Sequence, residues 1–284
     1  MASRRGSGEW ASGSPPDPAE VEVLIPTAGR VAELATTLAG LAAQDDPPFG
    51  VIVSDQSEEE VSRDPAVAAM LRVLDAQGRA VRVLRHLPRR GMAEHRHFLL
   101  DESTAPAVLF LDDDVWLEPG ALARLHDALV SLRTGFVGMA VQGLSHLGDE
   151  RPVEQRMFEP WTGPVLPETV RRDSDAFGRW PLHNAANLTH IAGRLRLVAG
   201  RWLPYKVAWV GGCVMFRREA LVAAGGFGFW RDLPEEHAGE DVLAQWRVME
   251  REGGAGIVPS GAVHLESPTT IPHRPVDAFD VASG

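Results

Sequence analysis

The stretch AVLFLDDDVWLEPG, residues 107–120, runs from five apolar residues into three consecutive acids and then becomes apolar again. The apolar run predicts a buried strand that ends at Asp112, Asp113 and Asp114. Like charges side by side repel one another, and the end of a buried strand solvates them poorly. The fold must therefore supply a partner that offsets this repulsion.

The sequence around this stretch alternates between strand and helix signals. Apolar, β-branched runs predict strands at 21–26, 49–55, 80–86 and 107–112. Helical spacing predicts helices at 27–44, 61–78, 91–103 and 118–132, the last with Pro119 in its first turn. Strands this apolar need cover on both faces, so we predict an α/β fold with a mostly parallel central sheet and helices on both sides.

Ligands of such sheets bind in a crevice at the carboxyl ends of the strands. Pro26 and Thr27 follow the first predicted strand, Asp55 ends the second, and the three acids end the fourth. We expect these residues to converge on one crevice.

The second half of the chain is less regular. A strand near 136–143 precedes loops and short elements at 144–207. A strand, a glycine pair and a helix follow at 207–227, then a helix with Glu240 and Asp241 in its first turn, and a strand leading to His264. We predict a disordered tail at 1–19, two halves of one domain at 20–142 and 143–270, and a tail at 271–284.

Bulk composition limits the function. The 284 residues carry a net charge of −11, which argues against a broad nucleic-acid surface. The single cysteine, Cys213, cannot form an internal disulfide and is predicted to be a small buried hydrophobe. The sequence contains no apolar run long enough to span a membrane and no secretory signal, so we expect a cytoplasmic location, with peripheral membrane contact and oligomeric state left open.

A divalent cation would offset the repulsion among the acids, because Mg²⁺ and Mn²⁺ take carboxylate and phosphate oxygens as ligands. Alternate residues leave a strand on the same side, so we expect Asp112 and Asp114 to face the crevice together while Asp113 faces elsewhere. The alternative is a solvated turn after a strand.

Several motifs in order resemble those of the family 2 glycosyltransferases, enzymes with the GT-A fold. They are VLIPTAGRVAELATTLAGLAAQ, VIVSDQS, RGMAEHRHFLLDES, LFLDDDVWLEPGAL, WVGGCVMFRREALVAAGGF and GEDVLAQWRV, between about Val21 and Glu266. The resemblance implies a Rossmann-like nucleotide-sugar half, a less regular acceptor-binding half, and transfer of a sugar from a nucleotide diphosphate sugar to an acceptor hydroxyl.

The resemblance also implies roles for single residues. The triplet Asp112–Asp114 matches the DxD motif of the family, with Asp114 as the principal metal ligand and Asp112 on the ribose or assisting the metal. His264 matches, more loosely, a histidine that completes the metal site in some relatives, and the metal would be Mn²⁺ or Mg²⁺. The residues implied to bind the nucleotide sugar are Pro26, Thr27, Arg30, Asp55 (on the base), Gly91, Arg96, Asp112, Asp113, Gly211 and Gly212.

In the same way, Asp241 matches the catalytic base of the family, and Glu240 would orient the acceptor. A carboxylate base can accept the proton of the acceptor hydroxyl as the new bond forms. A base opposite the leaving group implies inversion at the anomeric carbon. Both acids equally suit the first turn of any helix, where the helix dipole favours negative charge.

Other residues have structural alternatives as well. Asp55 suits a turn, Arg96 a surface helix, and His264 a structural histidine. The tryptophans of the second half would form either an acceptor platform or ordinary core, with Trp209 and Trp230 the foremost platform candidates; they are Trp161, Trp180, Trp202, Trp209 and Trp230. The loop FWRDLPEEHAGED, 229–241, resembles a mobile loop that orders over the donor.

The predicted activity is therefore that of a metal-dependent hexosyl- or related transferase (EC 2.4). It would use a UDP-sugar by default and a small-molecule, glycan or lipid-linked acceptor. The absence of membrane spans argues against a processive polysaccharide synthase. The alternatives are a sugar-phosphate nucleotidyltransferase, which would need a glycine-rich phosphate loop after the first strand, and a non-catalytic nucleotide-sugar-binding module.

Overall fold

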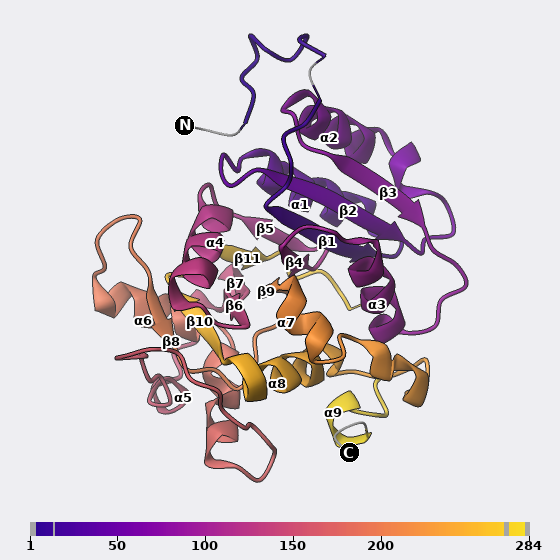
Figure 1. Ribbon diagram of the computed structural model, residues 1–284. Helices are drawn as coiled ribbons and strands as arrows, with labels where there is room; N and C mark the ends of the chain where they lie inside the picture. Colours follow the sequence, from indigo (N-terminus) through magenta and orange to yellow (C-terminus); the bar gives the residue numbers. More distant parts are fainter. Residues whose placement is uncertain (1–3, 14, 270–272, 282–284) are drawn as a thin grey trace.

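A computed structural model describes residues 4–13, 15–269 and 273–281. An eight-stranded sheet with the order β3-β2-β1-β4-β9-β6-β10-β8 forms the centre of the molecule (Figure 1). Its strands are β1 (Val21–Thr27), β2 (Phe49–Asp55), β3 (Val81–Arg85), β4 (Ala107–Leu111), β6 (Phe136–Gly138), β8 (Leu203–Tyr205), β9 (Cys213–Arg217) and β10 (Gly254–Val258).

Strands β3, β2, β1 and β4 pair in parallel, as their apolar sequences predict. The register sets Thr27 of β1 opposite Asp55 of β2, so the two strands end at the same level. Asp112 follows the last residue of β4, on the other side of β1. The carboxyl ends of these strands therefore lie together, as predicted, although the Asp55 side chain bonds to its own loop.

Alternating side chains of the sheet build two cores, one on each face. Val23 and Ile25 of β1 pack with helices α1 (Val31–Ala42), α2 (Pro65–Ala76) and α4 (Ala121–Leu132). Leu24 packs on the other face with α3 (Met92–Glu102), α7 (Arg218–Ala223) and α8 (Glu240–Glu252). Helices thus cover both faces, as predicted (Figure 1).

The half of the sheet beyond β4 is mixed in direction. Strand β9 lies between β4 and β6 and is antiparallel to both, and β8 is antiparallel to β10. Because β9 from the second half pairs with β4 from the first, the two predicted halves share one sheet.

A second, three-stranded sheet corrects two sequence predictions. The strand predicted at 136–143 divides into β6 and β7 (Gln142–Gly143), and the strand predicted before His264 divides into β10 and β11 (Ala262–His264). The small sheet has the order β5-β11-β7, with β5 at Val115–Leu117. Each predicted strand is in fact two short strands that belong to different sheets. The apolar sequence alone does not show where the first ends and the second begins.

The remaining helices are short. Helices α5 (Pro152–Gln155) and α6 (Asn187–Leu195) lie in the segment predicted to hold short elements, and 3₁₀ turns occur at 61–63, 144–148, 175–183 and 228–232. Pro119 precedes α4 instead of lying in its first turn, because Gly120 occupies the residue before the helix. No described helix combines the length and apolarity needed to cross a membrane.

The two predicted tails differ. In the described part of 1–19 no helix or strand forms, although Arg4 pairs with Asp45 and the Arg5 amide donates to the Gln77 carbonyl. The predicted disorder of that tail falls partly on residues 1–3 and 14, outside the described residues. The tail at 271–284, for which no element was expected, contains helix α9 (Ala278–Val281) with Ala278 and Phe279 buried.

Candidate active site

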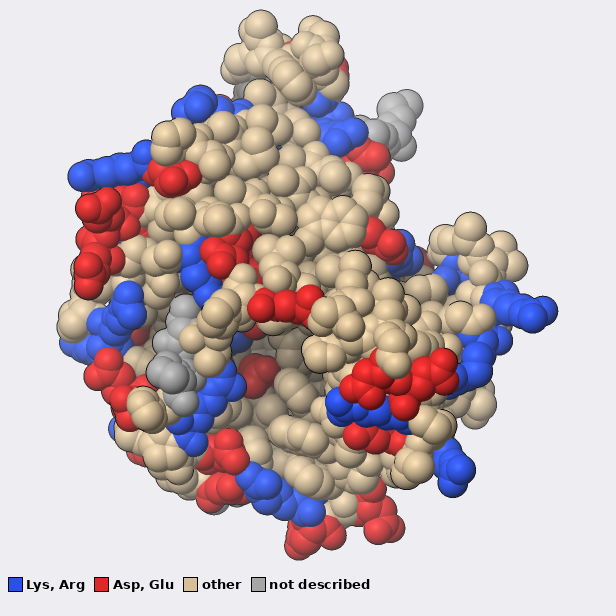
Figure 2. Space-filling view, turned by 180° about the vertical axis from the view of Figure 1, so that it is seen from behind, with Lys and Arg blue, Asp and Glu red and all other residues tan. Residues whose placement is uncertain are grey.

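A cavity of about 890 Å³ opens where β1, β2 and β4 end. Figure 2 shows the hollow on this face, with acidic side chains inside it. Thirteen of the predicted site residues line the cavity and Asp55 does not; the thirteen are Pro26, Thr27, Arg30, Gly91, Arg96, Asp112, Asp113, Asp114, Gly211, Gly212, Glu240, Asp241 and His264.

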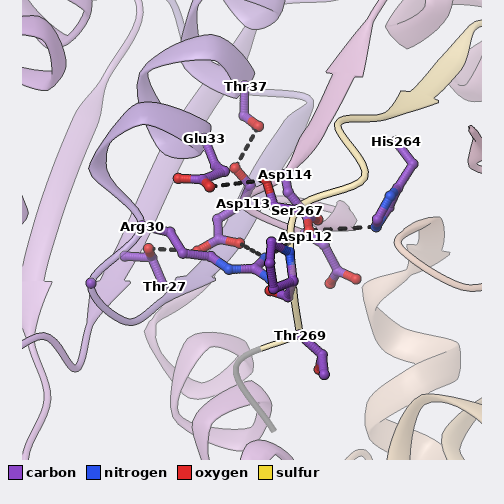
Figure 3. A network of polar contacts seen from close by, with 12 residues as sticks. Thr27, Arg30, Glu33, Thr37, Asp112, Asp113, Asp114, His264, Ser267 and Thr269 are labelled. Atoms are coloured by element: carbon purple, nitrogen blue, oxygen red, sulfur yellow. Dashed lines mark hydrogen bonds and ion pairs between the residues drawn. The ribbon is translucent and has the colours of Figure 1, made fainter. Parts of the chain in front are cut away.

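At the acid end of the cavity, defined by Thr27, Arg30 and Asp112–Asp114, an arginine holds two of the acids. Nη1 of Arg30 donates to Asp113 Oδ1 at 3.1 Å and to Asp114 Oδ2 at 2.6 Å. Thr27 Oγ1 donates to Asp113 Oδ2 at 2.7 Å (Figure 3). Asp113 therefore shares a cation with Asp114, and the expectation that it faces elsewhere is wrong.

The third acid is held by a different arginine. Nη2 of Arg96 donates to Asp112 Oδ1 at 3.0 Å, while its Nε donates to Glu240 Oε1 at 3.1 Å. Arg96 is 6% exposed, so it is a buried bridge between Asp112 and Glu240 and not the surface arginine of the alternative interpretation. Arginines of the chain itself thus offset much of the repulsion that the sequence attributed to a missing cation.

Burial shifts the pKa of one acid at this end. Removal from water raises the pKa of Asp113 to about 6, against the lowering effect of its bonds to Thr27 and Arg30. The backbone carbonyl of Asp113 also accepts from Thr37 Oγ1 at 2.7 Å, which ties the turn to α1. Both carboxylate oxygens of Asp113 are therefore bonded within the protein, whereas Asp112 and Asp114 each keep one oxygen without a contact among the described residues.

Two carboxylate oxygens at the acid end are available to a ligand. Asp112 Oδ2 and Asp114 Oδ1 take part in none of the hydrogen bonds or ion pairs among the described residues. Mg²⁺ and Mn²⁺ accept one or two carboxylate oxygens together with phosphate oxygens and water. These two carboxylate oxygens suit such an ion. No three His, Cys, Asp or Glu side chains of the described residues form a complete protein site for it.

The small sheet brings His264 to the acids. Pairing of β11 with β5 sets His264 opposite Val115, and its Nε2 lies 3.4 Å from Asp114 Oδ2. Its Nδ1 accepts the backbone N–H of Glu266 at 2.9 Å, so the ring proton lies on Nε2, the nitrogen that faces Asp114. His264 therefore lies within ion-pair distance of Asp114, at the edge of the acid end.

The first turn of α8 supplies the other pair of acids. Glu240 is 6% exposed and bound to Arg96, and Asp241 lines the cavity beside it. Removal from water, with the charge of Glu240 next, raises the pKa of Asp241 to about 7. The preceding Gly239 has a φ of +70°, and a Cβ there would come within 2.5 Å of the Phe279 ring, so only glycine fits this close approach.

The loop at 229–241, which is predicted to be mobile, lines the cavity with its residues 235–239. His237 Nε2 accepts the Ala93 N–H at 3.0 Å and its Nδ1 donates to the Pro234 carbonyl at 2.7 Å, which fixes the loop to the start of α3. Gly91 has a φ of +95°, and a Cβ there would lie 2.6 Å from the His237 ring. The mobility of the loop stays a prediction.

At the aromatic end of the cavity, defined by Trp180, His183, Trp209 and Phe279, rings replace charges. Trp180 and Trp209 stack with centroids 4.9 Å apart, and Phe279 of α9 lies 5.9 Å from Trp180. Burial lowers the pKa of His183 to about 4, so its ring is neutral, and its Nε2 bonds the Tyr205 hydroxyl at 3.0 Å. Trp209 Nε1 and His183 Nδ1 are buried without a hydrogen-bond partner among the described residues.

The two foremost platform candidates, Trp209 and Trp230, lie in different places. Trp209 lines the cavity, but Trp230 does not; it lies 6.5 Å from the ring of His97 instead. Trp180, a less favoured platform candidate, also lines the cavity. Phe279 lines it too, although it lies in the tail for which no element was expected. Cys213 is fully buried, as expected.

The sequence model described as Glycosyl transferase family 2 matches residues 22–222 of this chain. No curated protein matches the chain. Among solved structures, S. aureus TarS 1–349 is 16% identical with a TM-score of 0.56, covering 86% of this chain and 60% of TarS 1–349.

Two further structures carry nucleotide sugars. TarS 1–349 in complex with UDP-GlcNAc is 13% identical with a TM-score of 0.58, covering 88% of this chain and 60% of that one. The mannosyltransferase PcManGT from Pyrobaculum calidifontis, in complex with GDP-Man and Mn²⁺, is 18% identical with a TM-score of 0.55, covering 93% of this chain and 64% of that one. The chain thus has the fold of these GT-A glycosyltransferases and spans less than two thirds of their length.

Proposed function

Because the chain belongs to glycosyl transferase family 2, we propose that it moves a sugar from a nucleotide diphosphate sugar to an acceptor hydroxyl, with inversion at the anomeric carbon. The observation that carries the proposal is the meeting of the strand-end acids and the α8 acids in one cavity. The first set suits a diphosphate with its cation, and the second suits an acceptor hydroxyl.

Asp112 and Asp114 would hold Mn²⁺ or Mg²⁺, which when bound would neutralise the charge that develops on the leaving diphosphate. Both acids have an oxygen outside the arginine contacts, and PcManGT, which shares the fold, binds GDP-Man together with Mn²⁺. Arg30 adds a positive charge at the same end of the cavity, within the loop that follows β1.

Asp241 would accept the proton of the acceptor hydroxyl as the new bond forms. A pKa raised to about 7 suits a general base that works near neutral pH, because such a group is basic enough to take the proton while about half of it stays ionised. Glu240 is held by Arg96 and would accept a hydrogen bond from the acceptor and orient it.

The acceptor would lie against the aromatic end. The stacked pair Trp180 and Trp209 presents a flat apolar surface, which suits the C–H face of a sugar ring. The unpartnered nitrogens Trp209 Nε1 and His183 Nδ1 would bind acceptor hydroxyls. This half of the site can take the sugar of a small glycoside, a glycan or a lipid-linked saccharide.

For the donor, UDP is our default carrier and GDP the second choice. TarS binds UDP-GlcNAc and PcManGT binds GDP-Man, and both share the fold of this chain. We keep the cytoplasm as the predicted compartment.

A donor panel tests the proposal. The protein is incubated with Mn²⁺ and UDP-, GDP- and dTDP-sugars, and release of nucleotide diphosphate is measured with water as the acceptor. We expect release from at least one donor, its loss on chelation with EDTA, and its restoration by Mn²⁺. Binding of a sugar nucleotide without release of nucleotide diphosphate would favour the non-catalytic module, and failure to bind any sugar nucleotide would contradict the proposal altogether.

A further inference from the structure

The segment 176–218 contains no aspartate or glutamate, although the whole chain carries a net charge of −11. Three of its arginines are exposed and lie where α6 ends and in the loop that leads to β8; they are Arg194, Arg196 and Arg201. Residues 194–202 are called the basic loop below. Positive charge is therefore concentrated on one small part of an acidic molecule.

None of the three arginines of the basic loop forms an ion pair among the described residues. Arg194 donates to the neutral Oε1 of Gln155 at 2.6 Å. Asp127 of α4, an acid that contacts the basic loop, accepts from Trp202 Nε1 at 2.8 Å. The three positive charges therefore remain available to anions outside the protein.

The tip of the basic loop is apolar and projects from the body of the molecule (Figure 1). Val198 is 74% exposed, and its carbonyl accepts the Arg201 N–H at 2.9 Å, which closes a tight turn. Gly200 in this turn has a φ of +76°, a conformation that favours glycine. A single exposed valine is ordinary on a protein surface, but this one is held at a projecting tip between Arg196 and Arg201.

We propose that the basic loop docks on an anionic lipid bilayer, a role that goes beyond sugar transfer. The arginines contact the lipid phosphates, while Val198 and Ala199 enter the boundary between headgroups and acyl chains. Charge attraction and apolar contact together strengthen attachment to a membrane surface. A projecting tip suits a fluid surface, which needs no matching pocket, better than it suits a folded partner.

The position of the basic loop also bears on the acceptor, a step that rests on the proposed function. The 3₁₀ turn that carries Trp180 and His183 of the aromatic end leads directly into α6. The nine residues of α6 span about 14 Å, so docking keeps the aromatic end close to the lipid surface. Among small glycosides, glycans and lipid-linked saccharides, the last therefore fit this arrangement best.

Co-sedimentation of the full chain with vesicles tests the docking, using phosphatidylcholine alone or mixed with phosphatidylglycerol. We expect binding only to the mixed vesicles, and its loss at high salt, because salt screens the attraction. The double variant Arg196→Ala/Arg201→Ala should weaken binding by about 25-fold, since each basic residue near an anionic surface contributes about fivefold. Val198→Asp should weaken it by about tenfold or more, because it removes the apolar tip and adds a negative charge.

Two controls make the same chemical changes elsewhere. Arg63→Ala/Arg72→Ala removes two exposed arginines next to β3, at the opposite end of the sheet from β8, and should bind vesicles like wild type. Val222→Asp adds a charge at a valine of α7 that is 49% exposed, and should also bind like wild type. Donor hydrolysis without vesicles should be unchanged in all four variants, because none of these residues lines the cavity.

The inference is overturned if wild-type protein binds neither kind of vesicle, or if the double variant of Arg196 and Arg201 binds as wild type does. It is also overturned if Val198→Asp binds as wild type does, because the contact would then be a charge effect without insertion. The proposed function fails separately, when wild-type protein without vesicles neither binds nor cleaves any sugar nucleotide.

Discussion

The two ends of the cavity differ in whether their polar groups already have partners within the protein. At the acid end every carboxylate already has a cation of the chain beside it, Arg30 for Asp113 and Asp114 and Arg96 for Asp112. At the aromatic end, Trp209 Nε1 and His183 Nδ1 are buried and lack partners among the described residues. A ligand at the acid end would meet carboxylates that already have a cation beside them, whereas a ligand at the aromatic end would complete missing hydrogen bonds.

This difference shows where strength and selectivity come from in the site. Charges that are already paired keep the acid end folded without a ligand, so the proposed cation and diphosphate would add to a stable framework. Unpartnered donors next to stacked rings have a cost that a hydroxyl-bearing ring removes, so binding there selects for shape and hydrogen bonding. Asp241 lies in the same cavity as both ends, and substitutions on each side should separate their roles.

The largest effect should come from Asp241, the proposed base. Asp241→Asn removes the base but keeps the size of the side chain, so transfer should fall by about 10²- to 10⁴-fold while donor affinity stays the same. Turnover of the preferred sugar nucleotide and calorimetric affinity for its nucleotide diphosphate give the two measurements. The matched control is Glu236→Gln, an exposed acid that also lines the cavity, which should keep wild-type turnover. Transfer within tenfold of wild type in Asp241→Asn would show that another group is the base.

A smaller effect should divide the acid end itself. Asp114→Ala removes a free carboxylate oxygen, so Mn²⁺ and donor affinity should fall together by about 10- to 100-fold. Asp113→Asn should instead destabilise the fold by about 1–3 kcal/mol, because it weakens charge-assisted bonds from Thr27 and Arg30. Manganese titration followed by electron paramagnetic resonance and thermal melting measure the two quantities.

This pair of variants tests the structural correction to Asp113. If Asp113→Asn loses Mn²⁺ as strongly as Asp114→Ala with no change in melting temperature, Asp113 is a ligand and not a support. Equal losses of stability in both variants would show that Arg30 needs both acids to hold the turn after β4.

The acid end was predictable from the sequence because topology alone brings it together. Apolar runs bounded by proline, glycine or acids place β1, β2 and β4 to within one residue, and parallel pairing then aligns their carboxyl ends. The sequence could not predict which arginine pairs with which acid. Arg30 and Asp113 are 83 positions apart and Arg96 and Glu240 are 144 apart, so their pairing depends on tertiary placement.

The aromatic end was predicted only in part, for a different physical reason. Trp180 lies in a 3₁₀ turn and Phe279 in a four-residue helix, both too short to show a periodicity. Phe279 is held by Arg172, which stacks over its ring at 4.7 Å and pairs with Asp277 and Asp280. Such contacts between irregular segments leave no pattern along the chain.

The smallest predicted effect concerns the aromatic end. Trp180→Ala removes one ring of the stacked pair, so the KM for a sugar acceptor should rise by about 2- to 10-fold, which corresponds to the roughly 0.5–1.5 kcal/mol of an aromatic contact. Hydrolysis of the donor by water should stay the same, because the acid end is untouched. Transfer to a panel of methyl pyranosides and donor hydrolysis are measured in parallel.

Trp202→Ala is the matched control for Trp180→Ala, because Trp202 lies outside the cavity and donates from Nε1 to Asp127 at 2.8 Å. It removes the same ring area without approaching the acceptor, so its KM should equal that of wild type. If Trp180→Ala slows hydrolysis and transfer equally, the ring supports the donor and the division of the cavity into two ends is wrong. If only the pyranoside KM changes, the stacked rings bind the acceptor, and the two ends work as separate sites joined by Asp241.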